Sequence, residues 1–102
     1  MRGRIRAGIA AIVAAGLVAG GAVAAHATTE YVGGGKWSYG VYEPANTVYV
    51  YSNYYHPSKK HRSTVQVHNG TQYRSKDAPA GKTAEIERAT SYGGNKAWWY
   101  AY

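Results

Sequence analysis

The chain has 102 residues, with 12 lysines and arginines, five acids and no cysteine. This length limits it to one small domain, and the absence of cysteine excludes a fold stapled by disulfides. The excess of positive charge favours anionic partners.

The first 27 residues have the pattern of a secretory signal peptide. MRGRIR carries three arginines and no acid, the run from Ala7 to Ala25 is uncharged, and Ala25-His26-Ala27 is a small-x-small cleavage signal. This interpretation predicts a secreted domain over residues 28–102 with nine lysines and arginines against five acids, a net charge of +4. A retained membrane anchor is the alternative, because the uncharged run is long enough to span a bilayer.

The predicted domain begins without regular structure. Residues 28–32 are expected to form a loose N-terminus, and the three glycines at 33–35 a flexible link. The next segment reads KWSYGVY, with an apolar or aromatic residue at every second position, so a short strand is expected over residues 36–42. The EPAN sequence at 43–46 has the residues of a turn.

The stretch from Thr47 to His68 reads TVYVYSNYYHPSKKHRSTVQVH and is the centre of the predicted fold. It opens as a strand that places Val50 and Tyr54 on one face. A basic loop follows, HPSKKHR at 56–62. The closing STVQVH alternates again and places Val65 inward.

The rest of the chain adds a hairpin and two strands. Asn69-Gly70 is the strongest hairpin signal in the sequence. TAEIERAT at 83–90 fits either a strand or a two-turn helix, and the strand is preferred because threonines stand at both ends. The terminal AWWYAY is expected to be a strand, with Trp98 and the following tyrosines on one face and Trp99 between alanines on the other.

Five or six short strands with turns at near-regular spacing predict an all-β fold, either a small antiparallel sandwich or a barrel. The core must come from valines, Ile86, tyrosines and tryptophans, because residues 28–102 contain no Leu, Phe or Met. Such a core would gain from a homodimer, since dimerisation removes more surface from water.

The sequence shows no catalytic or metal-binding pattern. His56, His61 and His68 have no cysteine and no nearby acid to complete a metal shell, and no GxSxG occurs. Glu85 and Glu87 would project from one strand face, where two solvated carboxylates are far commoner than a glycosidase pair. We therefore predict no enzyme, no metal and no cofactor.

Basic residues interleaved with aromatics also occur in proteins that bind single-stranded nucleic acid. The signal peptide argues against that function, and no nucleic-acid partner is predicted. The same aromatic sheet could stack on sugar rings, so a wall-binding module stays open.

Three segments of the predicted domain carry a specific resemblance. They are YSNYYHPSKKHRSTV at 51–65, GGKW with a following YG at 34–40, and AGKTAEIERAT from Ala80, followed by GN and an aromatic terminus. In their order along the chain, 34–40, 51–65 and then 80 onward, they resemble the lactococcin 972 bacteriocin family over nearly the whole domain. The chain departs from the family pattern at Pro57, which stands where a glycine follows the histidine, and in a longer connection between Trp37 and Tyr51.

The resemblance implies a secreted, unmodified antibacterial protein with a β-sandwich of two roughly three-stranded antiparallel sheets, often dimeric. It implies binding of lipid II, the cell-wall precursor, and a block of septum formation in related Gram-positive bacteria. A producer is expected to carry a membrane immunity protein and an ABC transporter. The alternative is a secreted module of the same fold that binds wall polymer or another partner and does not kill.

The loop between the two central strands is the predicted target-binding site. Such a loop can aim several side chains at one point, and lysine and arginine form charge-assisted hydrogen bonds with phosphate oxygens. The alternative is an ordinary solvated basic loop. The predicted contacts are Lys59, Lys60 and Arg62 to the anionic group, His56 and His61 as flanking donors, and Tyr54 and Tyr55 against the sugar or lipid portion.

Overall fold

The computed structural model describes residues 7–12 and 26–102, and its regular structure there is almost entirely strand. The one helical segment in this part of the chain is a 3-10 turn, η1, at Pro44–Asn46. The strands are β1 (Ala7–Ile12), β2 (His26–Val32), β3 (Gly35–Tyr42), β4 (Val48–Tyr55), β5 (His61–Gln66), β6 (Gln72–Arg74), β7 (Thr83–Thr90) and β8 (Asn95–Ala101).

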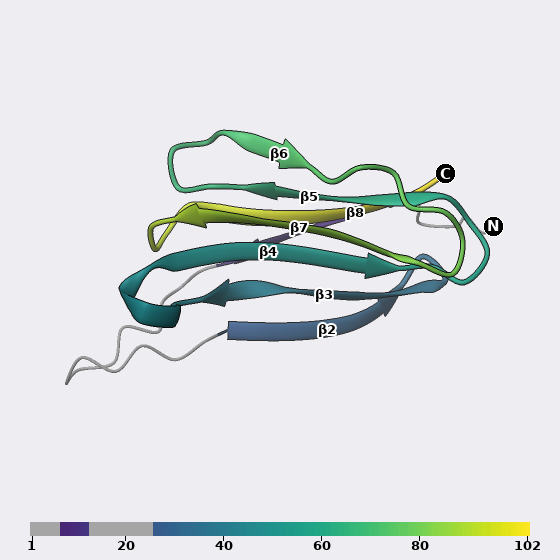
Figure 1. Cartoon of the computed structure of the whole chain (residues 1–102), viewed down its shortest axis with the longest axis horizontal. Coiled ribbons are helices and arrows are strands. Elements are labelled where there is room, and N and C mark those ends of the chain that lie inside the picture. Colours follow the sequence, from purple (N-terminus) through teal and green to yellow (C-terminus); the bar gives the residue numbers. More distant parts are fainter. Residues whose placement is uncertain (1–6, 13–25) are drawn as a thin grey trace.

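The strands form two antiparallel sheets packed against each other (Figure 1). The β8 sheet has the order β1-β8-β5-β6, and the β4 sheet has the order β2-β3-β4-β7. The predicted all-β sandwich is therefore confirmed, with four strands in each sheet where about three were expected. TAEIERAT is a strand, β7, and the turn at Asn69-Gly70 joins β5 to its antiparallel partner β6.

Strand β1 comes from the segment predicted to be a signal peptide. It pairs with β8, so that Gly8 lies opposite Trp99. The predicted cleavage point after Ala27 falls inside β2. The other leader residues, 1–6 and 13–25, lie outside the described part of the chain, in which no helix is long and apolar enough to cross a membrane. Removal of β1 would leave three strands in the β8 sheet, with β8 at its edge.

Residues 28–32, expected to be loose, belong to β2, because every residue of that strand pairs with β3. The glycines that follow form a tight turn and not a flexible link. Gly33 has a φ of 61° and Gly34 a φ of 86°, in the left-handed region that residues with a side chain avoid. Gly33 also packs so closely on Trp99 that an added Cβ would lie 2.3 Å from a ring carbon.

Replacing Gly33 with alanine should lower the free energy of unfolding by roughly 2–5 kcal/mol. The left-handed backbone costs an alanine about 1–2 kcal/mol, and overpacking against Trp99 adds about 1–3 kcal/mol. Gly81→Ala is the matched control, since Gly81 has a φ of 84° but no atom within 4 Å of an added Cβ. Denaturant unfolding followed by circular dichroism compares the two variants. If both variants lose the same free energy of unfolding, the close contact between Gly33 and Trp99 does not add to the cost of the Gly33 substitution.

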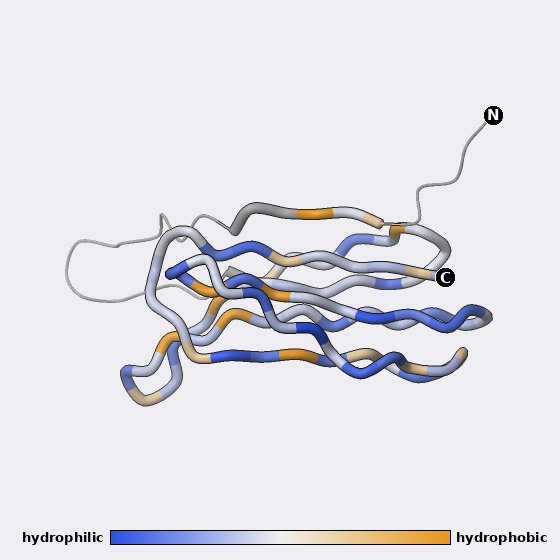
Figure 2. Tube along the Cα trace, turned by 90° about the horizontal axis from the view of Figure 1, so that it is seen from above, coloured by the Kyte–Doolittle hydropathy of each residue, from blue (hydrophilic) through white to orange (hydrophobic). Residues whose placement is uncertain are grey.

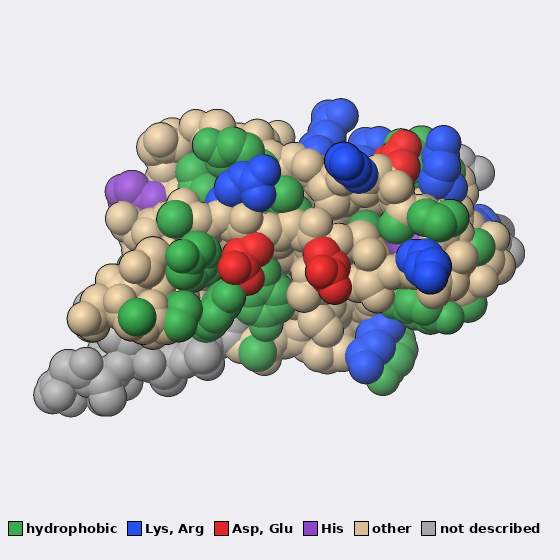
Figure 3. Space-filling view, viewed as in Figure 1, with side chains coloured by type: hydrophobic (Ala, Val, Ile, Leu, Met, Phe, Trp, Pro, Cys, Tyr) green, Lys and Arg blue, Asp and Glu red, His purple; other side chains and the backbone are tan. Residues whose placement is uncertain are grey.

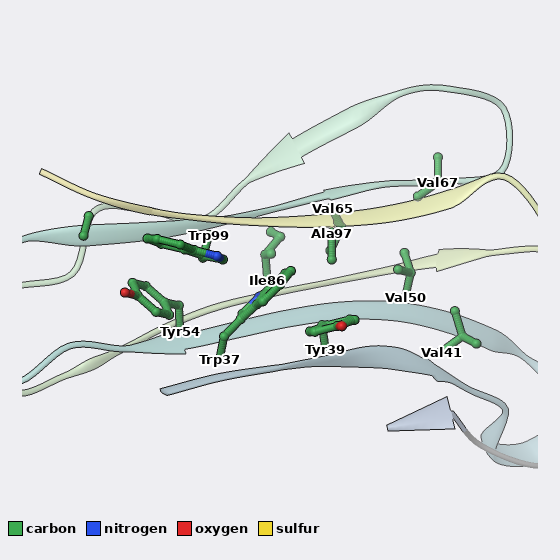
Figure 4. Close-up of a cluster of buried hydrophobic side chains, with 11 residues drawn as sticks. Trp37, Tyr39, Val41, Val50, Tyr54, Val65, Val67, Ile86, Ala97 and Trp99 are labelled. Carbon is green, nitrogen blue, oxygen red and sulfur yellow. The ribbon is translucent and has the colours of Figure 1, made fainter. Parts of the chain in front are cut away.

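The core lies between the sheets and takes alternate residues from each strand (Figure 4). Hydrophobic positions occur singly along much of the chain (Figure 2), as expected for strands with one buried face. Trp37, Val50 and Tyr54 enter the core from the β4 sheet, and Val65 and Trp99 enter it from the β8 sheet. The rings of Tyr54 and Trp99 lie 5.1 Å apart between their centroids. Aromatic rings thus supply the buried area that leucine supplies in most domains.

Two buried serines tie the sheets together. Ser52 Oγ accepts a hydrogen bond from Trp37 Nε1 at 2.9 Å and donates one to the carbonyl of Trp98, across the sandwich, at 2.9 Å. Ser63 Oγ of β5 donates to the carbonyl of Ala84 of β7 at 3.0 Å. Each hydroxyl satisfies polar groups that burial would otherwise leave unpaired.

The stability of the fold should fall between pH 10 and pH 12. Burial raises the pKa of Tyr54 from 10.0 to about 12, and burial followed by the hydrogen bond to Glu30 raises the pKa of Tyr39 from 10.0 to about 12. The folded protein therefore holds these protons more tightly than the unfolded chain. This difference in proton affinity adds to the free energy of unfolding. The added stability is fully present below pH 10 and is lost as the pH rises to about 12.

Thermal melts at a series of alkaline pH values test this expectation. Tyr39→Phe removes one of the tyrosines whose pKa is raised, so the melting temperature of that variant should fall less steeply over the same window. A melting temperature of the unmodified protein that stays level from pH 10 to pH 12 would contradict the prediction.

Candidate functional site

The basic loop connects β4 to β5 at one end of the sandwich, where lysine and arginine side chains gather (Figure 3). Pro57 and Ser58 are exposed at its tip, and Lys59 is half-buried. Its shape depends on the two histidines at its ends, because both rings are buried beneath it.

His56 holds the first half of the loop. Its Nε2 lies 3.0 Å from the carbonyl oxygen of Gly33, and its Nδ1 accepts hydrogen bonds from the backbone N–H groups of Ser58 at 3.1 Å and Lys59 at 3.0 Å. A ring that accepts at Nδ1 and faces a carbonyl at Nε2 carries its proton on Nε2. His56 is thus a neutral ring that ties the loop to the glycine turn.

His61 holds the second half. Its Nδ1 lies 2.8 Å from the carbonyl oxygen of Lys59, and its Nε2 lies 2.7 Å from the carbonyl oxygen of Lys82. A carbonyl only accepts, so a hydrogen bond to either carbonyl needs an N–H group on the ring. The buried ring of His61 therefore joins the basic loop to the connection before β7.

The structure divides the seven predicted contacts into two groups. His56, His61 and Tyr54 have exposed fractions of 3%, 0% and 0%, and the Tyr54 hydroxyl donates to the carbonyl of Val32 at 2.8 Å. Their predicted role as target contacts does not fit this burial; they shape the loop from below. The predicted contacts that reach the surface are Tyr55, Lys59, Lys60 and Arg62.

The side chains of Lys60 and Arg62 contact Tyr102 at the C-terminus. Lys60 Nζ lies 4.5 Å from the centroid of the Tyr102 ring, and Arg62 donates to the Tyr102 hydroxyl at 2.9 Å. That hydroxyl donates to the carboxylate of Asp77 at 2.9 Å, and Lys60 Nζ lies 3.9 Å from the same carboxylate. The positive charges of the loop therefore lie next to the residue that follows β8.

The outer face of the β8 sheet carries a hollow of about 180 Å³. Arg62 Cζ lies 4.5 Å from the centroid of the Tyr100 ring, and the register places Thr64 between Trp98 on β8 and Arg74 on β6. Ala7 of β1 also lines the hollow, so loss of the predicted leader would open it on that side. We define the basic aromatic face as Arg62, Arg74, Trp98 and Tyr100, which all line this hollow.

Comparison with known proteins gives one family. A family model described as Bacteriocin (Lactococcin_972) matches residues 33–99, which are 67 of the 102 residues. The chain belongs to the lactococcin 972 bacteriocin family. No curated protein and no solved structure matches it.

Membership in the lactococcin 972 family marks the chain as a bacteriocin-like antibacterial protein. It also indicates a non-enzymatic protein of a family whose members are typically secreted. The matched segment runs from the Gly33 turn to Trp99 and includes the basic loop. It does not assign a role to any residue.

Of the four residues in the basic aromatic face of this lactococcin 972 family member, sequence reasoning identified only Arg62 as a target contact. Alternation along β8 places Trp98 and Tyr100 on the face opposite to Trp99, and this was the signal that could have identified them. Arg74 gave no signal of its own. It reaches the face only because β6 folds back on β5, which pairs it with Thr64.

The described residues contain no group of three or more His, Cys, Asp or Glu side chains placed to hold a metal ion. Glu85 and Glu87 lie on the outer face of the β4 sheet, on the other side of the sandwich from the basic aromatic face.

Proposed function

We propose that this lactococcin 972 family protein is exported, loses residues 1–27 and kills related Gram-positive bacteria by binding lipid II and blocking septum formation. One observation carries the proposal: two arginines and two aromatic rings line a single hollow on the outer face of the β8 sheet. Family membership supports the antibacterial activity.

The arginines suit the pyrophosphate of such a precursor. Arg62 and Arg74 come from different strands, so their guanidinium groups can approach a phosphate from two directions. Each guanidinium presents a planar fork of donors that matches two phosphate oxygens. Lys59 and Lys60 extend the positive charge along the loop, which favours the approach of an anionic ligand.

The aromatic rings suit the sugar portion. Trp98 and Tyr100 are half-buried, so each keeps part of its ring at the surface. Arg62 stacks on the Tyr100 ring and holds both groups in place. A sugar ring packed on these rings would leave its phosphate beside the arginines.

Export is tested by the mass of the secreted protein. The predicted cleavage after Ala27 should yield a product that begins at Thr28. Intact-mass measurement of protein from the culture medium decides this, and a full-length product retained in the membrane would contradict it.

Removal of the basic residues tests the binding site. Arg62→Gln/Arg74→Gln should lower the affinity for lipid II at least about a hundredfold, since each charge-assisted bond contributes roughly 1.5–3 kcal/mol and about 1.4 kcal/mol is tenfold. Lys59→Gln/Lys60→Gln/Arg62→Gln should also lose killing with an unchanged melting temperature. Binding to lipid II in vesicles, killing of sensitive cells and thermal melts are measured together.

Lys36→Gln/Arg88→Gln is the matched control, because it removes the same charge from the β4 sheet. It should bind and kill normally. Undiminished binding and killing by the folded Arg62→Gln/Arg74→Gln variant would remove the basic aromatic face from the mechanism. Killing by the unmodified protein should be reversed by added lipid II. Binding without killing would instead favour a wall-binding module.

A further inference from the structure

The outer face of the β4 sheet has a chemistry opposite to that of the β8 sheet. Two rows of paired residues cross it and end in carboxylates, and Figure 3 shows acidic side chains near the middle of the visible surface with hydrophobic ones beside them. One row is Ala27, Gly40, Tyr51 and Glu87, and the next is Thr29, Ser38, Asn53 and Glu85.

These rows enclose two adjoining hollows. One, of about 320 Å³, is lined by Tyr42, Tyr51, Asn53 and Glu87, among others. The other, of about 370 Å³, is lined by Asn53, Glu85, Ile86, Glu87 and Arg88. Each falls in the range of about 300–1,000 Å³ typical of ligand sites. Because they share Asn53 and Glu87, they form one shallow groove across β3, β4 and β7.

The groove has an aromatic wall. The rings of Tyr42 and Tyr51 meet edge to face with 5.8 Å between their centroids, and Tyr49 lies 5.7 Å from Tyr42. Gly40, in the row between Ala27 and Tyr51, contributes no side chain to the surface. A flat ring can therefore lie against the tyrosines, as sugar rings do on aromatic platforms.

The groove is lined by two carboxylates and one guanidinium, that of Arg88, so the lining has a net negative charge. Among the described residues, no lysine or arginine forms an ion pair with Glu85 or Glu87. Tyr42 donates a hydrogen bond to Glu87 Oε1 at 2.6 Å and so fixes that carboxylate at the aromatic wall. The hydrogen bond to Glu87 raises the pKa of Tyr42 from 10.0 to about 12, so the tyrosine remains a donor to Glu87 even in moderately alkaline solution.

We propose that this groove, the acidic tyrosine face, binds an oligosaccharide of amino sugars that carry free ammonium groups. The tyrosine wall packs on the apolar face of a sugar ring, and the Asn53 amide, which lines both hollows, meets ring hydroxyls. The unpaired carboxylates complement the ammonium groups and disfavour an anionic ligand. The site is separate from the basic aromatic face and does not depend on lipid II binding.

Isothermal titration of the purified protein with a glucosamine hexamer tests this proposal. The N-acetylated hexamer, which lacks the charge, should bind at least about tenfold more weakly, as should the glucosamine hexamer to Glu85→Gln/Glu87→Gln and to Tyr51→Ala. Tyr31→Ala is the matched control, since Tyr31 is 79% exposed on β2 and lines neither hollow. It should bind like the unmodified protein.

The outcomes separate cleanly. Tight binding that survives Arg62→Gln/Arg74→Gln but is lost in the glutamate variant supports the proposal. Equal binding of both hexamers would remove the role of charge, and equal binding of hexalysine would reduce the site to plain electrostatic attraction. Either result, or no binding at all, overturns the proposal. A failure of lipid II binding leaves this test unaffected.

Discussion

Replacing Trp99 with alanine should leave most of the protein molecules unfolded at physiological temperature. The ring is 2% exposed and packs on Tyr54 from the opposite sheet. It also fills the space above Gly33 and Gly8. Large-to-alanine changes of buried aromatic residues cost roughly 3–5 kcal/mol. A single core in a domain of this size supplies about the same amount.

Trp98→Ala is the control that separates folding from binding. Trp98 is the neighbouring residue on the same strand, but it faces outward and lines the hollow of the basic aromatic face. Its loss should leave the circular dichroism spectrum and most of the stability intact while weakening lipid II binding. A Trp99→Ala protein that melts within a few degrees of the unmodified one would show that the core does not depend on this ring.

Replacing His61 with alanine should lower the free energy of unfolding by roughly 3 kcal/mol or more. The ring is fully buried and lies within hydrogen-bond distance of two backbone carbonyls, and a buried polar group left without a partner costs about 1–3 kcal/mol. The variant also leaves the carbonyls of Lys59 and Lys82 without a partner. Hydrogen exchange should therefore rise throughout residues 56–62.

His68→Ala provides the comparison, because His68 is exposed and makes one side-chain bond, to the carbonyl of Gly93 at 3.0 Å. Its loss should change stability by less than about 1 kcal/mol. Denaturant unfolding of the two variants measures the difference. Similar stabilities would mean that the buried ring does not hold the loop.

The strands with clear alternation could be predicted from the sequence. On β8 the alanines at 97 and 101 leave room for Trp99 between them, and all three are buried as the pattern indicated. Strand β2 could not be found in this way. Its sequence has little alternation, and its stability comes from pairing with β3 through the glycine turn.

The site was predicted less well because the alternation of buried and exposed residues was not applied to the residues at the two ends of the loop. Alternation had already placed Tyr54 on the face of Val50, and that face is the core. The same count places His61 on the face of Val65, which is also buried. His56 is different: its burial depends on the carbonyl of Gly33, 23 positions away, which no local pattern reveals.

The position of Trp99 also sets the order in which the chain can fold. The ring that completes the core belongs to the last strand, and β8 lies inside its sheet between β1 and β5. A growing chain that lacks β8 has neither that ring nor the strand against which β5 pairs. Native packing of the two sheets therefore waits until β8 has been synthesised.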